Sequence, residues 1–204
     1  MSTRTIAVVS AGIGQPSSTR LLADRLAAAT VAELGSRGVS AEVTTVELRD
    51  VAHDVVNAML TGFPSGDLRG VLETVTGADG VIAVTPLFTT TYSGLFKSFV
   101  DVLDKESLTG MPVLLGATGG TQRHSLALEY SVRPLFTYLR ADVATTSVFA
   151  ATDDWAGEGD DLARRITRAG RELAEMVAAR QNAGPADAFG DVPSFAQMLG
   201  GIEG

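Results

Sequence analysis

Short apolar runs alternate with longer amphipathic segments along most of the chain. The runs are six to eight residues long and rich in β-branched residues, which is typical of strands buried on both faces of a sheet. Polar and glycine-containing turns separate them from the segments that follow. The predicted strands are residues 5–10, 41–48, 80–85, 112–117 and 143–150.

Between these runs, apolar residues recur at spacings of three and four, which predicts helices with one buried face each. A further helical turn is expected at residues 67–76, before the third strand. The predicted buried stripes are Leu22, Leu26 and Ala29; Ala52, Val56, Met59 and Leu60; Leu95, Phe99, Val102 and Leu103; Leu128, Val132, Leu135 and Phe136; and Leu162, Ile166, Ala169, Leu173, Met176 and Val177.

Strand and helix thus alternate five times, which predicts an α/β fold with helices on both faces of a parallel sheet. Five units favour a three-layer αβα sandwich with the flavodoxin-like strand order 2-1-3-4-5. We expect one domain over residues 1–181. The tail, residues 182–204, carries apolar side chains such as Phe189 and Phe195. We therefore expect it to pack on the body or on a neighbouring subunit.

In such a sheet, ligands bind beyond the carboxyl ends of the strands, where the strand order reverses. That point lies between the first and third strands. Three loops are expected to converge there, at residues 10–19, 86–93 and 118–124. Function is therefore sought in these loops.

The first loop, "SAGIGQPSST", is rich in hydroxyls and glycines, and Arg20 follows it at the start of a helix. Backbone N–H groups at a helix N-terminus attract anions, although Ser17, Ser18 and Thr19 are also ordinary helix-capping residues. The loop has no lysine for a triphosphate and lacks the third glycine of a dinucleotide fingerprint. Glu47 could stand for the ribose-binding acid of dinucleotide folds, but it lies 35 residues after Gly12 rather than about 20. A single phosphate fits the loop better.

The second stretch, "TPLFTTTYSGLFKSFVD", places Pro86, Phe88 and three threonines between a strand and a helix. A rigid turn with an aromatic side chain and hydroxyls suits a flat heteroaromatic ring. Phe88 as part of the core and Ser93 as a helix cap are the alternatives. The third stretch, "GATGGTQRH", brings glycines to the end of the fourth strand, where backbone can approach a ligand closely or simply turn. His124 is expected to be structural or to lie at the rim.

Net charge at neutral pH is −8, which argues against nucleic acid and anionic membranes as partners. There are no cysteines, and the two histidines lie far apart, so we expect no metal site. No apolar run is long enough to span a membrane, and the N-terminus makes a poor signal peptide. We therefore expect a cytoplasmic protein.

In combination, these stretches resemble the NAD(P)H-dependent FMN reductases, a flavodoxin-like family, over residues 4–176. The middle stretch stands where the family has P-x-Y-N-x-S-Y-S-G-x-L-K. Phe88, Thr89 and Thr91 replace the usual tyrosine, asparagine and serine. The resemblance implies that the FMN phosphate is surrounded by Ser10, Gln15, Ser17, Ser18, Thr19 and Arg20. It implies that the ring and ribityl chain are bordered by Pro86, Leu87, Phe88 and Thr89, and the pyrimidine side by Thr118, Gly119 and Gly120.

The resemblance further implies hydride transfer from NADPH or NADH to flavin N5, with no catalytic side chain. It also implies a homodimer or tetramer, and supply of reduced FMN to a two-component monooxygenase. The alternatives are a quinone or azo-dye reductase that retains FMN, a non-enzymatic electron carrier, and a scaffold that binds nothing. A receiver domain would need acidic residues after the first strand, where this chain has "VVSAG".

Overall fold

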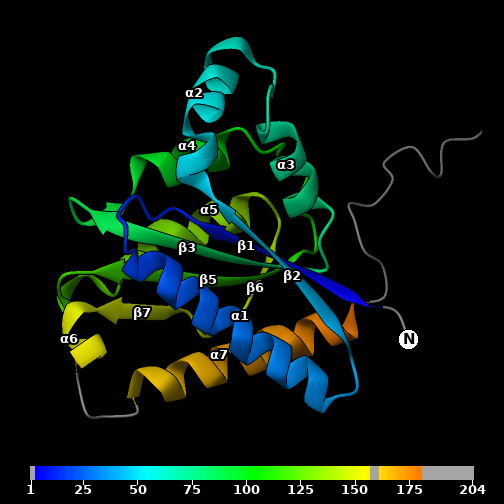
Figure 1. The fold of residues 1–204 in the computed structure, drawn as a ribbon, viewed down its shortest axis with the longest axis vertical. Coiled ribbons are helices and arrows are strands. Elements are labelled where there is room, and N and C mark those ends of the chain that lie inside the picture. Colours follow the sequence, from blue (N-terminus) through cyan, green and yellow to red (C-terminus); the bar gives the residue numbers. More distant parts are fainter. Residues whose placement is uncertain (1–2, 157–160, 181–204) are drawn as a thin grey trace, which may run out of the picture.

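The computed structural model describes residues 3–156 and 161–180, and the tail from residue 182 lies outside them. A twisted sheet crosses the centre of the molecule, with helices on both faces (Figure 1). Its main path has the order β2-β1-β3-β5-β6, while β4 pairs with β3 and β7 with β5. The described strands are β1 (Arg4–Ser10), β2 (Ala41–Glu47), β3 (Gly80–Phe88), β4 (Thr91–Tyr92), β5 (Pro112–Gly119), β6 (Asp142–Val143) and β7 (Val148–Ala151).

All pairings except the β3–β4 hairpin are parallel. Strand β4 is only the second arm of a hairpin, and β6 and β7 both pair with β5. Counted without β4, the parallel strands therefore have the order second, first, third, fourth, fifth, and the predicted flavodoxin-like fold is confirmed. The described α-helices are α1 (Ser18–Ser36), α2 (Ala52–Thr61), α3 (Leu68–Thr76), α4 (Gly94–Asp101), α5 (Arg133–Tyr138), α6 (Thr152–Ala156) and α7 (Asp161–Ala179); η1 (Leu48–Val51) and η2 (Gln122–His124) are 3₁₀ helices, and η3 (Leu128–Val132) is a π-helix.

Successive strand residues point to opposite faces, so each strand feeds two separate cores. In β1, Ile6 and Val8 pack with α1 and α7, whereas Ala7 and Val9 pack with the helices of the other face. Helices α1 and α7 cover one side of the sheet, and α2, α3, α4 and α5 cover the other (Figure 1). Gly170 of α7 is tightly placed against α1, because an added Cβ would lie 2.8 Å from Ala29 Cβ.

The predicted buried stripe of the second helix is wrong. Val56 and Met59 are about half exposed and Leu60 is 81% exposed, while α2 buries Val55 and Ala58 instead. Helix α2 projects from the body beside α3 (Figure 1). Only a narrow face of it therefore reaches the core, and its larger apolar side chains point outward.

The predicted fifth strand is interrupted after Val143 and resumes at Val148. Two side chains from other segments bind the backbone at this break. Arg133 donates to the backbone oxygen of Ala144 at 3.0 Å, and Glu172 accepts from the N–H and the hydroxyl of Thr146 at 2.7 and 2.6 Å. Ala144 still donates to the Val113 backbone oxygen of β5 at 2.8 Å, and beyond it the chain bulges before it rejoins β5 at Val148.

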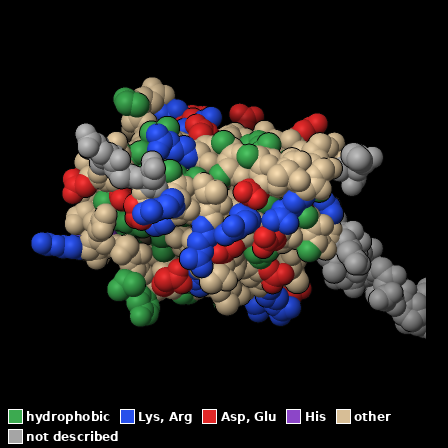
Figure 2. Space-filling model, turned by 90° about the horizontal axis from the view of Figure 1, so that it is seen from below, with side chains coloured by type: hydrophobic (Ala, Val, Ile, Leu, Met, Phe, Trp, Pro, Cys, Tyr) green, Lys and Arg blue, Asp and Glu red, His purple; other side chains and the backbone are tan. Residues whose placement is uncertain are grey.

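The outer face of α1 and α7 carries intermixed basic and acidic side chains, as seen from below in Figure 2. No helix within the described ranges is long and apolar enough to cross a bilayer. Among these residues there is also no group of three or more His, Asp or Glu side chains placed to hold a metal ion.

Candidate functional site

The carboxyl ends of β1, β3 and β5 lie side by side at one edge of the sheet. In the parallel register, Ser10 is the partner of Val84, and Thr85 is the partner of Ala117. The three loops predicted from the sequence therefore leave from the same edge, on the left of Figure 1. The hydroxyls of Thr19 and Thr118 share a buried hydrogen bond of 2.8 Å, which joins the first of these loops to the third.

The first loop folds back tightly onto the start of α1. An added Cβ on Gly12 would lie only 2.1 Å from the Ser17 hydroxyl oxygen. That hydroxyl caps the helix by accepting from the N–H of Arg20 at 3.2 Å. The capping role of Ser17 is thus confirmed. The first N–H groups of a helix, here those of Ser18 and Thr19, have no partner inside it and remain directed out of its end.

One buried hydroxyl at this edge has no hydrogen-bond partner within the described part of the chain. It belongs to Ser10, the last residue of β1, which is fully buried. Buried polar groups are nearly always hydrogen-bonded, and an orphaned group costs free energy. Its place at the root of the first loop marks a site where a polar ligand atom would satisfy it.

Two arginines flank the first loop, and one carboxylate lies between them. Glu47, the β2 residue paired with Ser10, accepts from Arg20 Nη1 at 2.6 Å and from Arg49 Nη2 at 2.7 Å. Arg20 also donates to Asp24 at 2.8 Å. The hydrogen bond to Asp24 is the main reason that the pKa of Arg20 is raised; burial opposes it, and Glu47 adds to it.

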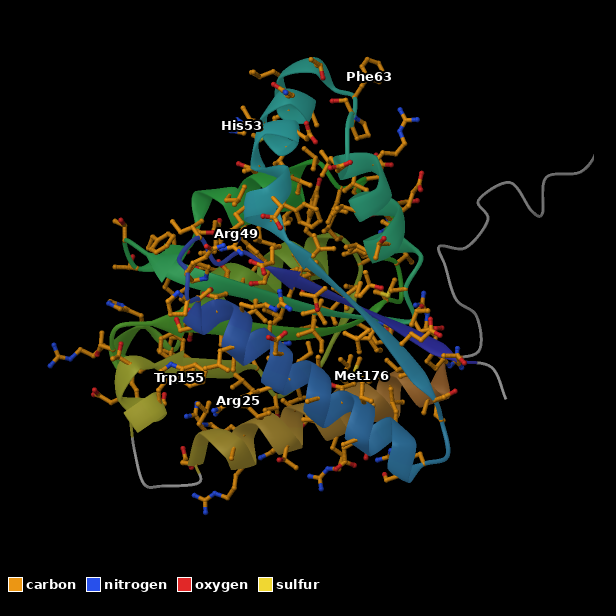
Figure 3. All side chains as sticks on the ribbon, in the orientation of Figure 1. Arg25, Arg49, His53, Phe63, Trp155 and Met176 are labelled. Carbon is orange, nitrogen blue, oxygen red and sulfur yellow. The ribbon has the colours of Figure 1, made fainter. Side chains whose placement is uncertain are left out.

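Arg49 also holds the loop itself. Its Nη1 donates to the backbone oxygen of Gly14 at 3.3 Å. With the amide oxygen of Gln15 turned towards the guanidinium, that oxygen accepts from Nη1 and Nη2 at 2.9 and 3.0 Å. Arg49 lies at this edge of the sheet, well away from Phe63 at the projecting tip (Figure 3). Sequence reasoning missed Arg49; the available signal was a basic residue two positions after a strand that ends beside the switch point.

The second loop is a tight hairpin that the sequence did not predict. Strand β3 continues past Thr85 to Phe88 and pairs back with β4, leaving a turn of only Thr89 and Thr90. Both turn residues have positive φ, 50° and 74°, as a type I′ turn requires. Phe88 is 46% exposed, so its alternative role as a core residue is wrong.

The remaining predicted residues of the second and third loops line the same edge. Pro86 and Thr118 are buried, and Leu87 is partly buried. Ser93 caps α4 by accepting from the N–H of Phe96 at 3.2 Å, as its alternative reading predicted. An added Cβ on Gly119 would lie 2.9 Å from Phe149, whereas one on Gly120 would meet nothing within 4 Å. Gly119 therefore lies close to the Phe149 ring, while Gly120 has an open face. His124, in η2, is partly exposed.

A pocket of about 680 Å³ opens at the other end of the sheet. It is lined by residues such as Leu72, Leu103 and Arg140. These residues precede β3, β5 and β6 along the chain, so the pocket lies at the amino edge. None of its lining residues belongs to the three loops.

Comparisons with known proteins show the family of the chain. A family model described as NADPH-dependent FMN reductase matches residues 4–156, a stretch that contains all three loops. The chain belongs to this family. An FMN reductase (NADPH) of Pseudomonas aeruginosa is 32% identical over 178 residues, which is 86% of this chain and 93% of the relative. The NADH-dependent FMN reductase SfnF of Pseudomonas fluorescens is 31% identical over 84% of this chain and 90% of its own.

Solved structures of FMN reductases and related proteins share the fold. An oxidoreductase from Corynebacterium diphtheriae is 44% identical, has a TM-score of 0.84, and matches 87% of this chain and 98% of its own. The NADH:FMN oxidoreductase EmoB, solved in its apo form, is 25% identical with a TM-score of 0.76, over 90% of this chain and 95% of its own. The family resemblance inferred from the sequence is therefore confirmed.

Proposed function

We propose that the protein binds FMN across the three loops and catalyses its reduction by NADPH or NADH. Reduction of FMN by a nicotinamide nucleotide is the activity of the family to which the chain belongs. The observation that carries the proposed site is the Thr19–Thr118 hydrogen bond of 2.8 Å. It holds the start of α1 beside the end of β5, so a phosphate bound at the first and a ring bound near the second belong to one ligand.

The first loop would hold the phosphate. The N–H groups of Ser18 and Thr19 lie at the positive end of a 19-residue helix, where an anion is favoured. The Ser10 hydroxyl, which lacks a partner within the described residues, would donate to a phosphate oxygen. Ser17, Gln15 and Arg20 complete the set, with Arg20 as its cation.

The second and third loops would hold the ring and the ribityl chain. Pro86 and Leu87 form a stiff backbone edge, and the half-exposed Phe88 offers apolar surface at the hairpin. Thr89 occupies the turn beside it. On the other side, Thr118 and Gly119 end β5, and Gly120 leaves its backbone open to a ligand.

When bound, FMN would supply a ring whose N5 atom can accept a hydride from the nicotinamide. The chain's own residues would bind the phosphate at the first loop and orient the ring beside the hairpin. Transfer of a hydride between two stacked rings needs no acid–base pair, and we assign no catalytic side chain. The absence of lysine and of the third glycine from the first loop suits one phosphate better than two.

Reduced FMN would then leave and serve a flavin-dependent monooxygenase. A homodimer or tetramer is supported by the exposed apolar side chains Val56, Met59, Leu60 and Phe63 on and after α2, because surfaces of this kind mark interfaces. The predicted packing of the tail falls outside the described residues.

The activity is tested by mixing the protein, stripped of flavin, with FMN and NADPH or NADH. We expect the nicotinamide absorbance band to decay while the flavin band bleaches and then recovers in air. Consumption of NADPH and NADH when a quinone is given to protein reloaded with one equivalent of FMN, but not when excess FMN is the acceptor, would instead assign the protein to the quinone reductases that retain FMN. No consumption with either acceptor would refute the proposal.

The phosphate site is tested by Arg20→Ala. Hydrogen bonds to charged groups contribute about 1.5–3 kcal/mol, so FMN affinity should fall about tenfold or more while riboflavin affinity stays the same. Arg37→Ala is the matched control, because Arg37 follows the far end of α1 and pairs with Glu175 there. Equal losses for FMN and riboflavin would remove Arg20 from the phosphate site.

A further inference from the structure

Glu47 forms ion pairs with both of the arginines that flank the first loop. Its side chain is 15% exposed, and its two oxygens accept from different guanidinium groups, Arg20 at 2.6 Å and Arg49 at 2.7 Å. It stands at the end of β2, directly beside Ser10 in the register. The carboxylate is therefore fixed next to the root of the loop in which the phosphate is proposed to bind.

The side chains around the loop carry no surplus positive charge. Arg20 also pairs with Asp24 at 2.8 Å, and Arg49 lies 3.6 Å from Asp50. Two guanidinium groups are thus matched by three carboxylates, and residues 11–19 of the loop contain no charged side chain. A phosphate dianion arriving here meets the helix end and the Ser10 hydroxyl, but its cations are already engaged.

We propose that Glu47 sets the affinity for the phosphate by competing with it for Arg20 and Arg49. This inference rests on the proposed function, because it takes the first loop as the phosphate site. A bound phosphate either draws a guanidinium away from Glu47 or binds beside a carboxylate. Both routes weaken FMN binding relative to a loop with unpaired arginines. Glu47 thereby keeps FMN exchangeable, as a flavin that must leave after reduction requires.

Among the described residues, Glu47 bonds Arg20 and Arg49 and makes no hydrogen bond of its own to residues 11–19 of the loop. Arg49 contacts the Gly14 carbonyl and the Gln15 amide directly, and Gly12 packs against the Ser17 cap. A glutamine in place of Glu47 has the same size and still accepts from one arginine. Glu47→Gln therefore removes the competing charge and leaves the other contacts of the loop in place.

The experiment measures FMN and riboflavin binding to wild type and to Glu47→Gln, each stripped of flavin. We expect Glu47→Gln to bind FMN about tenfold more tightly, which corresponds to about 1.4 kcal/mol, with slower FMN release. Riboflavin affinity should not change, because riboflavin carries no phosphate. The gain should shrink as salt is added, since the site is partly exposed. Glu175→Gln removes the same charge from a pair at the far end of α1 and should change neither affinity.

Three results separate the possible failures. If Glu47→Gln binds FMN no more tightly than wild type, Glu47 does not compete with the phosphate. If it weakens FMN and riboflavin together, Glu47 is a structural clamp and the inference is overturned. If wild type binds FMN no better than riboflavin, the proposed phosphate site itself fails. The double variant Arg20→Gln/Glu47→Gln locates the cation, because the gain should be lost if Arg20 is the arginine that is released.

Discussion

A side chain at Gly12 would collide with the Ser17 hydroxyl, which occupies the space beside the Gly12 Cα. A Cβ added at Gly12 would lie 2.1 Å from Ser17 Oγ and 3.1 Å from Thr19 Cβ. In Gly12→Ala the Ser17 hydroxyl must turn away from the N–H of Arg20, which it now caps at 3.2 Å. The same methyl group presses on Thr19, whose hydroxyl is bonded to Thr118.

These two effects set the expected magnitude. Loss of a serine N-cap costs about 1 kcal/mol, and disturbance of a buried hydrogen bond costs about 1–3 kcal/mol. We therefore expect Gly12→Ala to lower the free energy of unfolding by about 2–4 kcal/mol in the absence of flavin. FMN affinity should fall as well, because the helix end that would receive the phosphate is distorted. Urea unfolding and flavin titration measure the two quantities.

A double-mutant cycle decides whether the clash with Ser17 is the cause. In a Ser17→Ala background the hydroxyl is absent, so Gly12→Ala should cost at least about 1 kcal/mol less than it does in wild type. Gly14→Ala is the control within the same loop, since its nearest contact is the Pro16 carbonyl at 3.3 Å. A Gly12→Ala protein as stable as Gly14→Ala, or the same cost in both backgrounds, would refute the reasoning.

Two further predictions concern the hairpin and the bulge. Thr90→Gly should raise the free energy of unfolding by about 1 kcal/mol, because a β-branched residue is strained at a φ of 74°. The control Thr91→Gly, in the strand, should lower the free energy of unfolding. Destabilisation by Thr90→Gly would contradict the assignment of strain. Burial raises the pKa of Glu172, but hydrogen bonds from Thr146 and Arg168 outweigh this, and the net pKa lies below 4.5. Glu172→Gln should therefore be less stable than wild type by about 1–2 kcal/mol above pH 4.5, and this difference should vanish as the pH falls through the lowered pKa. Urea unfolding across that range checks the effect, and a gap that persists in acid would remove its electrostatic cause.

The strand order and the three site loops were predictable because β1, β3 and β5, which are largely buried, leave continuous apolar runs in the sequence. The prediction that residues 41–48 form a buried strand is wrong for most of β2, which lies at the edge of the sheet and is largely exposed. Other elements left no comparable signal. The hairpin turns at Thr89 and Thr90, and the asparagine or glycine residues that usually indicate such a turn are absent from these two positions. Helix α2 carries Val55 and Val56 side by side. Periodicity alone could not tell which of the two faces the core, because that depends on how far α2 projects from the body.

The break in the fifth strand is a tertiary effect. Residues 143–150 read as one strand because their own composition favours it, yet Arg133 and Glu172 reach in from other segments to bind the backbone there. Arg49 was missed for a related reason. It belongs to none of the three loops in sequence, and only the fold brings it to the loop that contains Gly14.

The Thr19–Thr118 hydrogen bond fixes the distance between the start of α1, where the FMN phosphate is proposed to bind, and the end of β5, where the ring is proposed to bind. A ligand that engages one place presents its other end to the second at a high effective concentration. FMN would then bind far better than free phosphate and riboflavin added together at the same concentrations. Thr118→Val would break the hydroxyl pair while keeping the volume, and it should affect FMN more than either fragment. The hydrogen bond therefore preorganises the proposed site, because it sets the distance between the phosphate and ring subsites before FMN binds.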